Sequence, residues 1–105
     1  MEDLTRDAYR LLCLIYDLYQ SKVKSGMSKS QAKKFETNFY SSEKRLSKWH
    51  EDDINSALNE LTNKHYLKTN ILDEHTLTDQ SIIKMENKFK NNASEILDIL
   101  SNFIP

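Results

Sequence analysis

Glycine, proline and cysteine each occur only once in this sequence, as Gly26, Pro105 and Cys13. Tight turns rely on glycine and proline, so their scarcity argues against a many-turned all-β fold and favours long helices. One cysteine cannot form an intramolecular disulfide, and its apolar neighbours in residues 11–15 (LLCLI) predict a buried thiol. The cytoplasm, a reducing compartment, is therefore the expected location.

Long apolar runs are also missing. The longest covers residues 11–16, between Arg10 and Asp17, and is too short to span a bilayer. The first residues (MEDL) are acidic and do not resemble a signal peptide. With 105 residues, 38% of them hydrophobic, the chain is expected to form one domain over residues 1–105.

Apolar spacing predicts a helix at each end of the chain. The first runs from about residue 3 to residue 25 and is apolar over a wide arc, and Gly26 is a natural C-terminal stop. The last covers residues 93–103, and its core positions are Ala93, Ile96, Leu97, Leu100 and Phe103. Both are expected to flank a core formed by about residues 26–90.

The segment between these helices begins with a second helix. Ser28 and Gln31 have the spacing of a capping box, and Ala32 and Phe35 are expected to face the core. Residues 37–48 are ambiguous: they can hold a short helix around 42–46 or a loop, with Phe39, Tyr40 and Leu46 turned inward.

A third helix gives the clearest local signal. With His50 as N-cap, Trp49 and Ile54 are placed to form a hydrophobic staple. Three acids, Glu51, Asp52 and Asp53, occupy the first turn, where the helix dipole favours negative charge. The predicted buried stripe is Ile54, Ala57, Leu58 and Leu61.

After this helix the pattern changes to that of a hairpin. Residues 66–72 are predicted as a strand, 73–75 as a turn and 76–77 as a short return strand. Thr78 is placed to cap a fourth helix that begins at Asp79. That helix carries Ile82, Met85, Glu86 and Phe89 on one side.

Two spaced patterns, Ile54-x3-Leu58-x2-Leu61-x4-Tyr66-Leu67 and Leu77-Thr78-x3-Ile82-x3-Glu86, resemble the third helix, wing and fourth helix of bacterial winged-helix proteins. The sequence is similar to the small YjcQ-like proteins of low-GC Gram-positive bacteria and their phages. The resemblance covers about residues 47–90. It implies a mainly α fold with a small β-hairpin: a winged helix-turn-helix with flanking N- and C-terminal helices.

The resemblance also identifies two positions where such families usually have glycine. One lies just before the Tyr-Leu strand start, where the helix ends in a left-handed residue, and is His65 here. The other lies in the first turn of the fourth helix and is Ser81 here. Histidine tolerates a positive φ better than most residues but less well than glycine.

Winged helices that bind DNA usually lay the third helix in the major groove. Its outward residues here include Ser56 and a stripe formed by Asn55, Asn59 and Asn63. Asparagine can pair with the exposed edge of adenine, so this stripe is a candidate reader of A·T pairs. The alternative is a solvated polar face in an Asn-rich chain.

Charge is unevenly distributed along the chain. Residues 22–50 carry eight Lys or Arg and two acids, whereas residues 51–105 carry five lysines and ten acids. The candidate phosphate contacts in the basic segment are Lys29, Lys33, Lys34, Lys44, Arg45 and Lys48. The three acids that begin the third helix oppose this, because they would repel a phosphate backbone.

Two functions follow from these patterns. The first is a DNA-binding transcriptional regulator. The alternative is a winged-helix module that binds protein without DNA, and it gains if folding scatters the six basic residues. A homodimer is expected through the flanking helices, with Tyr9, Tyr16, Leu97, Leu100 and Phe103 as candidate interface residues. The alternative is that the last helix packs on the first within a single chain.

Motifs for catalysis or metal binding are not recognisable. The three histidines, His50, His65 and His75, lack metal-ligand spacing, and neither a nucleophile elbow nor a glycine-rich phosphate loop is found. The sequence therefore predicts no enzymatic activity, no cofactor and no metal.

Overall fold

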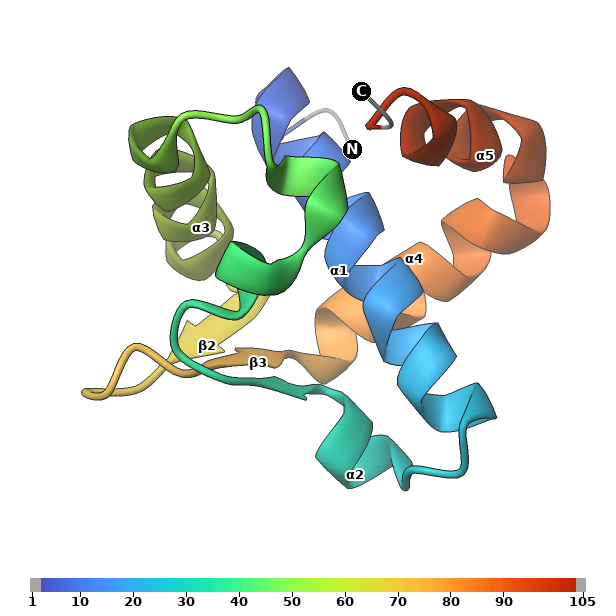
Figure 1. The fold of residues 1–105 in the computed structure, drawn as a ribbon. Helices are drawn as coiled ribbons and strands as arrows, with labels where there is room; N and C mark the ends of the chain where they lie inside the picture. The colour runs from blue at the N-terminus through green and yellow to red at the C-terminus, as the bar shows by residue number, and fades with distance from the viewer. Residues whose placement is uncertain (1–2, 104–105) are drawn as a thin grey trace.

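The structure is a computed structural model and describes residues 3–103. This part of the chain is mainly helical, with five α-helices, two 3-10 helices and a small antiparallel sheet (Figure 1). The elements are α1 (Arg6–Lys24), α2 (Lys29–Ala32), β1 (Lys34–Phe35), η1 (Phe39–Ser42), η2 (Lys44–Leu46), α3 (Glu51–Asn63), β2 (Leu67–Thr69), β3 (His75–Leu77), α4 (Asp79–Asn91) and α5 (Ala93–Ser101).

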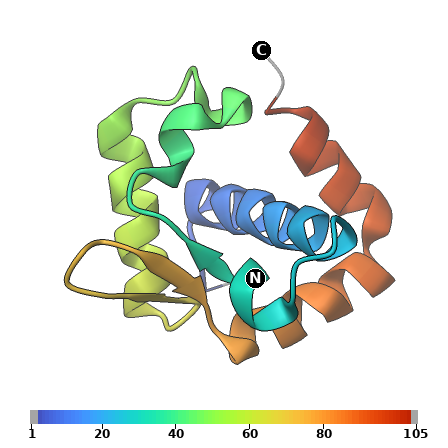
Figure 2. The same cartoon turned by 60° about the horizontal axis from the view of Figure 1, so that its bottom comes forward.

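Helix α1 forms the centre of the core. Thr5 caps its N-terminus, and every residue from Leu11 to Tyr16 is buried. Figure 2 shows α1 passing through the middle, with α3 on one side and α4 and α5 on the other. The wide apolar arc predicted from the sequence is confirmed, because partners cover the helix on several sides. Burial raises the pKa of the Cys13 thiol to about 12, so the thiol is protonated at neutral pH.

The segment after α1 departs from the sequence prediction. Gly26 ends α1 at φ 106°, and Ser28 accepts a hydrogen bond from the Gln31 amide, both as expected. The second helix stops at Ala32, however, and Phe35 lies in strand β1 instead. The reason is a competing partner: the Lys33 carbonyl accepts from the Leu77 amide, 2.9 Å away, and this contact aligns β1 with β3.

Residues 37–48 form the two 3-10 helices η1 and η2. Leu46 is buried, and Phe39 and Tyr40 are half-buried against the core, so all three turn inward as predicted. Asn38 begins η1 in the left-handed conformation, at φ 59°, which asparagine tolerates better than most residues.

Helix α3 begins at Glu51 with His50 as N-cap and buries the four residues predicted for its inner stripe. Trp49 stacks on Phe103 with ring centroids 5.6 Å apart, and the Arg10 guanidinium lies over both rings. Trp49 and Ile54 line one hollow, while direct contact between them stays a prediction.

The C-terminus of α3 has the geometry of a Schellman motif. The Tyr66 amide donates to the Leu61 carbonyl at 2.8 Å, and the His65 amide donates to the Thr62 carbonyl at 3.1 Å. His65 has φ 67°, so the left-handed conformation expected at this position is confirmed. It is occupied by a residue with a Cβ atom, which makes it a strained helix end.

The three strands form one antiparallel sheet in the order β1-β3-β2. The predicted hairpin is confirmed. Its first strand, β2, is shorter than predicted, its return strand, β3, begins one residue earlier at His75, and β1 is an additional strand. Lys34 and Lys68 both pair with Thr76, so these three residues share the outer face of the sheet.

Helices α4 and α5 close the core. Thr78 caps α4 by accepting from the Ser81 amide, as predicted, and the buried Ser81 hydroxyl donates to the Thr78 carbonyl at 2.9 Å. Met85 is buried and Glu86 is exposed. Helix α5 packs against α1. Of the core positions predicted for this helix, Ile96 and Phe103 are buried, whereas Ala93 and Leu97 are exposed.

Candidate functional site

The most distinctive surface is the exposed side of α3 together with residues 69–75 of the hairpin, called here the α3–hairpin face. The loop of the hairpin is held by side chains. The Asn70 side-chain oxygen accepts from the amides of Leu72 and Glu74, at 2.9 and 3.0 Å. The Thr37 hydroxyl donates to the Leu72 carbonyl. These bonds fix the loop, and Asp73 has a left-handed φ of 59° within it.

A hydrogen-bonded chain joins the hairpin to α3. The Thr62 hydroxyl donates to the Leu58 carbonyl at 2.9 Å, so its oxygen must accept from the Thr69 hydroxyl at 2.8 Å. The Thr69 oxygen can then only accept from His75 Nδ1, 2.9 Å away. The network therefore assigns the hydrogen to Nδ1 and leaves Nε2 as an acceptor.

Two hollows adjoin α3, the first on the α3–hairpin face and the second between the start of α3 and the segment that contains η1 and η2. The first, of about 290 Å3, is lined by Asn38, Tyr40, Asn55, Leu58, Asn59, Thr69, Asp73 and His75. The second, of about 300 Å3, is lined by Asn38, Tyr40, Ser41, Leu46, Ser47, Trp49, Glu51 and Ile54. Asn38 and Tyr40 belong to both linings and form a shared wall, in which the Tyr40 hydroxyl donates to Asn38 Oδ1 at 3.0 Å.

The charge of this face is negative. The exposed residues Glu51, Asp52 and Asp53 lie at the start of α3, and Asp73 and Glu74 lie in the hairpin loop. Burial raises the pKa of Tyr40, and the nearby charges of Glu51 and Asp73 raise it further. Both carboxylates therefore act on the wall between the hollows.

The tip of the hairpin is apolar. Ile71 is 98% exposed and Leu72 is 67% exposed, and the two acids Asp73 and Glu74 follow directly. An isoleucine side chain that makes almost no contact within its own chain contributes little to folding, so its exposure needs another explanation.

The outward residues predicted on the third helix are confirmed in position: Asn55, Ser56, Asn59 and Asn63 are all exposed. Asn55 and Asn59 line the first hollow, whereas Ser56 and Asn63 lie outside both hollows. The stripe thus divides between a hollow and open surface.

Two of the six basic residues predicted to assist this helix pair with acids outside it. Arg45 binds Asp17 at 2.8 Å and Glu43 at 2.9 Å, and Lys33 lies 3.8 Å from Asp79. The exposed ones are Lys29, Lys34, Lys44 and Lys48, and they come from α2, β1, η2 and the segment after η2.

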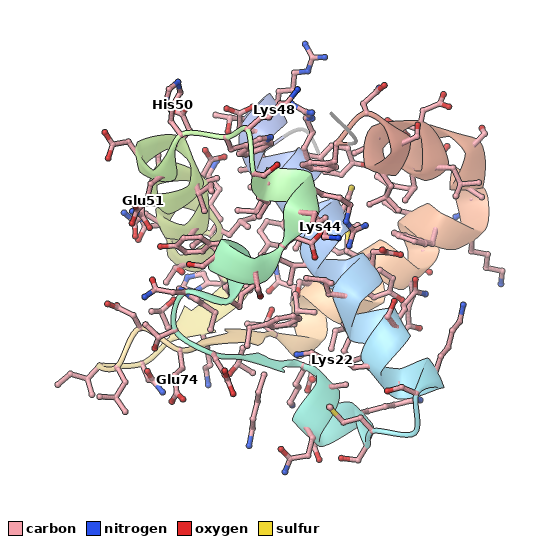
Figure 3. All side chains as sticks on the ribbon, viewed as in Figure 1. Lys22, Lys44, Lys48, His50, Glu51 and Glu74 are labelled. Atoms are coloured by element: carbon pink, nitrogen blue, oxygen red, sulfur yellow. The ribbon has the colours of Figure 1, made fainter. Side chains whose placement is uncertain are left out.

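Figure 3 shows where the labelled charges lie. Lys44 lies in front of α1 and Lys48 lies near the segment that leads into α3, whereas Glu51 and Glu74 project on the side of α3 and the hairpin. In the described part of the chain, no lysine or arginine lines either hollow. A negative face that lacks its own cations is poorly suited to a phosphate backbone.

The five predicted dimer residues do not form one exposed surface. Tyr16 and Phe103 are buried, and Tyr9 and Leu100 are half-buried. Only Leu97 is largely exposed, at 65%. Most of the apolar surface expected to join two copies is covered within the chain, because α5 packs on α1. This part of the interface prediction is corrected.

Metal ligands do not converge within residues 3–103, where no group of three His, Cys, Asp or Glu side chains is placed to hold an ion. His50 and His65 are exposed and lie apart from the His75 network. In the same range, no helix is long and apolar enough to cross a membrane.

Sequence patterns did not identify the shared wall of the hollows. Asn38 and Tyr40 lie in the ambiguous segment, and the pattern around Asp73 and His75 predicts only a turn. One signal was available: Asn70 precedes the loop, and asparagine side chains often close such turns.

Comparison with protein-family models, with curated proteins and with solved structures gave no match.

Proposed function

We propose that this chain is a winged-helix domain whose α3–hairpin face binds another protein. Support for the fold comes from the order of elements, in which α3 precedes a hairpin and the sheet order is β1-β3-β2. In this assignment η1 and η2 stand where a winged helix has its second helix, α3 is the third helix, and residues 70–74 form the tip of the wing.

The observation that carries the binding proposal is the pairing of exposed apolar groups with negative charge. Ile71 and Leu72 extend from the hairpin directly before Asp73 and Glu74, and three further acids lie at the α3 N-terminus. Apolar side chains ringed by charge are typical of protein interfaces, where burial supplies affinity and charge directs the encounter. A partner with a basic surface and an apolar depression would complement this face.

Site-specific crosslinking tests the proposal in cells that naturally express the chain. A photoreactive phenylalanine analogue at position 71 should capture a discrete protein adduct. The matched control is position 83, where Ile83 is also exposed, at 61%, but lies on α4. An adduct at 71 that is absent at 83 supports the proposal, and equal patterns at both positions contradict it.

A second candidate, a DNA-binding transcriptional regulator, is favoured by one observation: Asn55, Asn59 and Asn63 are exposed along α3. In that case Asn59→Ala should weaken binding about 5- to 150-fold on the preferred site alone, as expected for a lost base contact. Lys29→Ala and Lys34→Ala should weaken binding to every sequence, because they would remove phosphate contacts.

A further inference from the structure

We propose that the two hollows beside Tyr40 receive two basic side chains, arginine or lysine, from one segment of the protein partner. This inference rests on the proposed function and names the chemistry of the partner. The supporting observations are the carboxylates, amides, imidazole and aromatic ring that line the hollows, and not the acids alone.

Both hollows contain hydrogen-bond acceptors, and the second also contains the apolar side chains of Leu46, Trp49 and Ile54. Each contains one carboxylate, Asp73 in the first and Glu51 in the second, and the amide groups of Asn38, Asn55 and Asn59 add carbonyl oxygens. Arginine has five N–H donors and no acceptor, and lysine has three donors and no acceptor. A lining rich in acceptors and free of cations therefore matches these two side chains.

His75 supplies an independent indication of a ligand. Its side chain lines the first hollow although the residue is only 8% exposed. Its Nδ1 is committed to Thr69, and no described residue donates to Nε2. Burial lowers the pKa of His75, an effect that the charge of Asp73 opposes, so the ring is neutral at pH 7. Nε2 is reachable by solvent, since it is not among the buried polar atoms that lack a partner in the described chain, and a guanidinium or ammonium group that enters the hollow can donate to it.

Tyr40 provides an aromatic surface between the two carboxylates. A cation over an aromatic face is stabilised by the ring quadrupole. The same chain uses this contact elsewhere, because the Lys22 ammonium lies 3.8 Å from the centroid of Phe35 and the Arg10 guanidinium lies 5.3 Å from that of Trp49. A basic side chain in either hollow would meet the ring and a carboxylate together.

The size of the hollows favours side chains over a whole small molecule. Their volumes of about 290 and 300 Å3 lie at the lower limit of pockets that hold drug-sized ligands. Two such hollows with a shared wall are suited to two neighbouring side chains of one segment.

The test is a nuclear magnetic resonance titration of the full chain with an acetylated, amidated Gly-Arg-Ala-Arg-Gly peptide. Shifts should concentrate at Tyr40, at the Asn55 and Asn59 side-chain amides, and at the His75 ring. The same peptide with citrulline in place of arginine keeps the shape and removes the charge, and spermidine supplies charge without a peptide.

Matched variants locate the binding. Glu51→Gln and Asp73→Asn should each weaken peptide binding about tenfold, because each removes a charge-assisted hydrogen bond. Asparagine at position 73 tolerates the left-handed conformation, so the hairpin is retained. Asp52→Asn is the control, since Asp52 is exposed in the same turn of α3 and lines neither hollow. It should change binding less than twofold.

Several results would overturn the inference: no shifts at the hollows, equal binding of the citrulline peptide, binding of spermidine as tight as that of the arginine peptide, or an equal loss with Asp52→Asn. If the peptide fails while crosslinking at position 71 still captures a partner, the protein-binding function stands and only the basic segment is rejected. Peptide binding at the hollows without a captured partner would support the hollows and contradict the proposed function.

Discussion

Replacing His65 with glycine should stabilise the protein. His65 is the left-handed residue that ends α3, at φ 67°, and it is exposed. The two bonds of the Schellman motif are made by backbone atoms of residues 61, 62, 65 and 66, so glycine retains both. The substitution therefore removes the strain of a Cβ atom without removing a hydrogen bond.

The size of the effect follows from two opposing terms. A left-handed conformation costs an L-residue with a Cβ atom about 1–2 kcal/mol. Glycine loses about 0.5–1 kcal/mol more conformational free energy than alanine on folding. The net gain for His65→Gly is about 0.5–1 kcal/mol, which corresponds to a rise in Tm of about 2–8 °C for a domain of this size.

Gly26 offers the matched control, because it ends α1 at φ 106° with the same pair of bonds, from Gly26 to Val23 and from Met27 to Lys22. A Cβ atom added at Gly26 would have no neighbouring atom within 4 Å. Gly26→Ala should therefore cost about 1 kcal/mol through backbone strain alone. Urea unfolding followed by circular dichroism measures both. A loss of stability in His65→Gly would refute the argument and show that the imidazole makes a favourable contact.

Three further predictions concern the core and the site. Leu58→Ala should lower the free energy of unfolding by about 2–5 kcal/mol, because burial is lost and a cavity is left. The substitution of the exposed Ser56 with alanine should change it by no more than about 0.5 kcal/mol in the same urea titration. Because the folded state lowers the pKa of His75, the unfolded chain binds more protons, and the free energy of unfolding should fall as the pH drops below about 6.5. The variant His75→Asn should flatten this dependence when unfolding is measured from about pH 7 to about pH 5. An unchanged slope would reject the role of His75. Ile96→Glu should unfold the chain because Ile96 is buried, while Leu97→Glu should leave the circular dichroism spectrum unchanged. If α5 joins two copies, Leu97→Glu should also halve the mass measured by light scattering. A dimer that persists in this variant would exclude the contact.

Sequence patterns predicted most helices well because each of these buries a stripe of at least four apolar residues or carries a clear cap. The inner stripe of α3, the Thr78 cap and the left-handed residue at position 65 are examples. Helix α5 is the exception, since it fully buries only Ile96 and has no side-chain cap. Strand β1 was not predictable, since two residues show no alternation and Phe35 also fits helical spacing from Ala32. Its conformation depends on pairing with β3, 40 residues away along the chain.

The candidate site was predicted only in part, for a similar reason. The outward asparagines of α3 follow from helical periodicity, but the wall that completes the hollows comes from Asn38 and Tyr40 in a segment with no period. The sequence also did not predict which charged residues form ion pairs. Arg45 counts as a basic residue in the sequence, yet folding places it between Asp17 and Glu43. A tally of charges along the chain therefore overstated the cations available to a phosphate backbone.

Our proposal that the α3–hairpin face binds protein rather than DNA can be checked by a salt-titrated duplex-binding assay. Fluorescence anisotropy would be measured with mixed-sequence and AT-rich duplexes, starting at an ionic strength of about 0.01 M, where electrostatic attraction is least screened. Because five exposed acids lie on this face, we predict no saturable binding to either duplex. Saturable binding that weakens steeply with salt, and that Asn59→Ala reduces only on the AT-rich duplex, would contradict the account and establish the DNA-binding alternative.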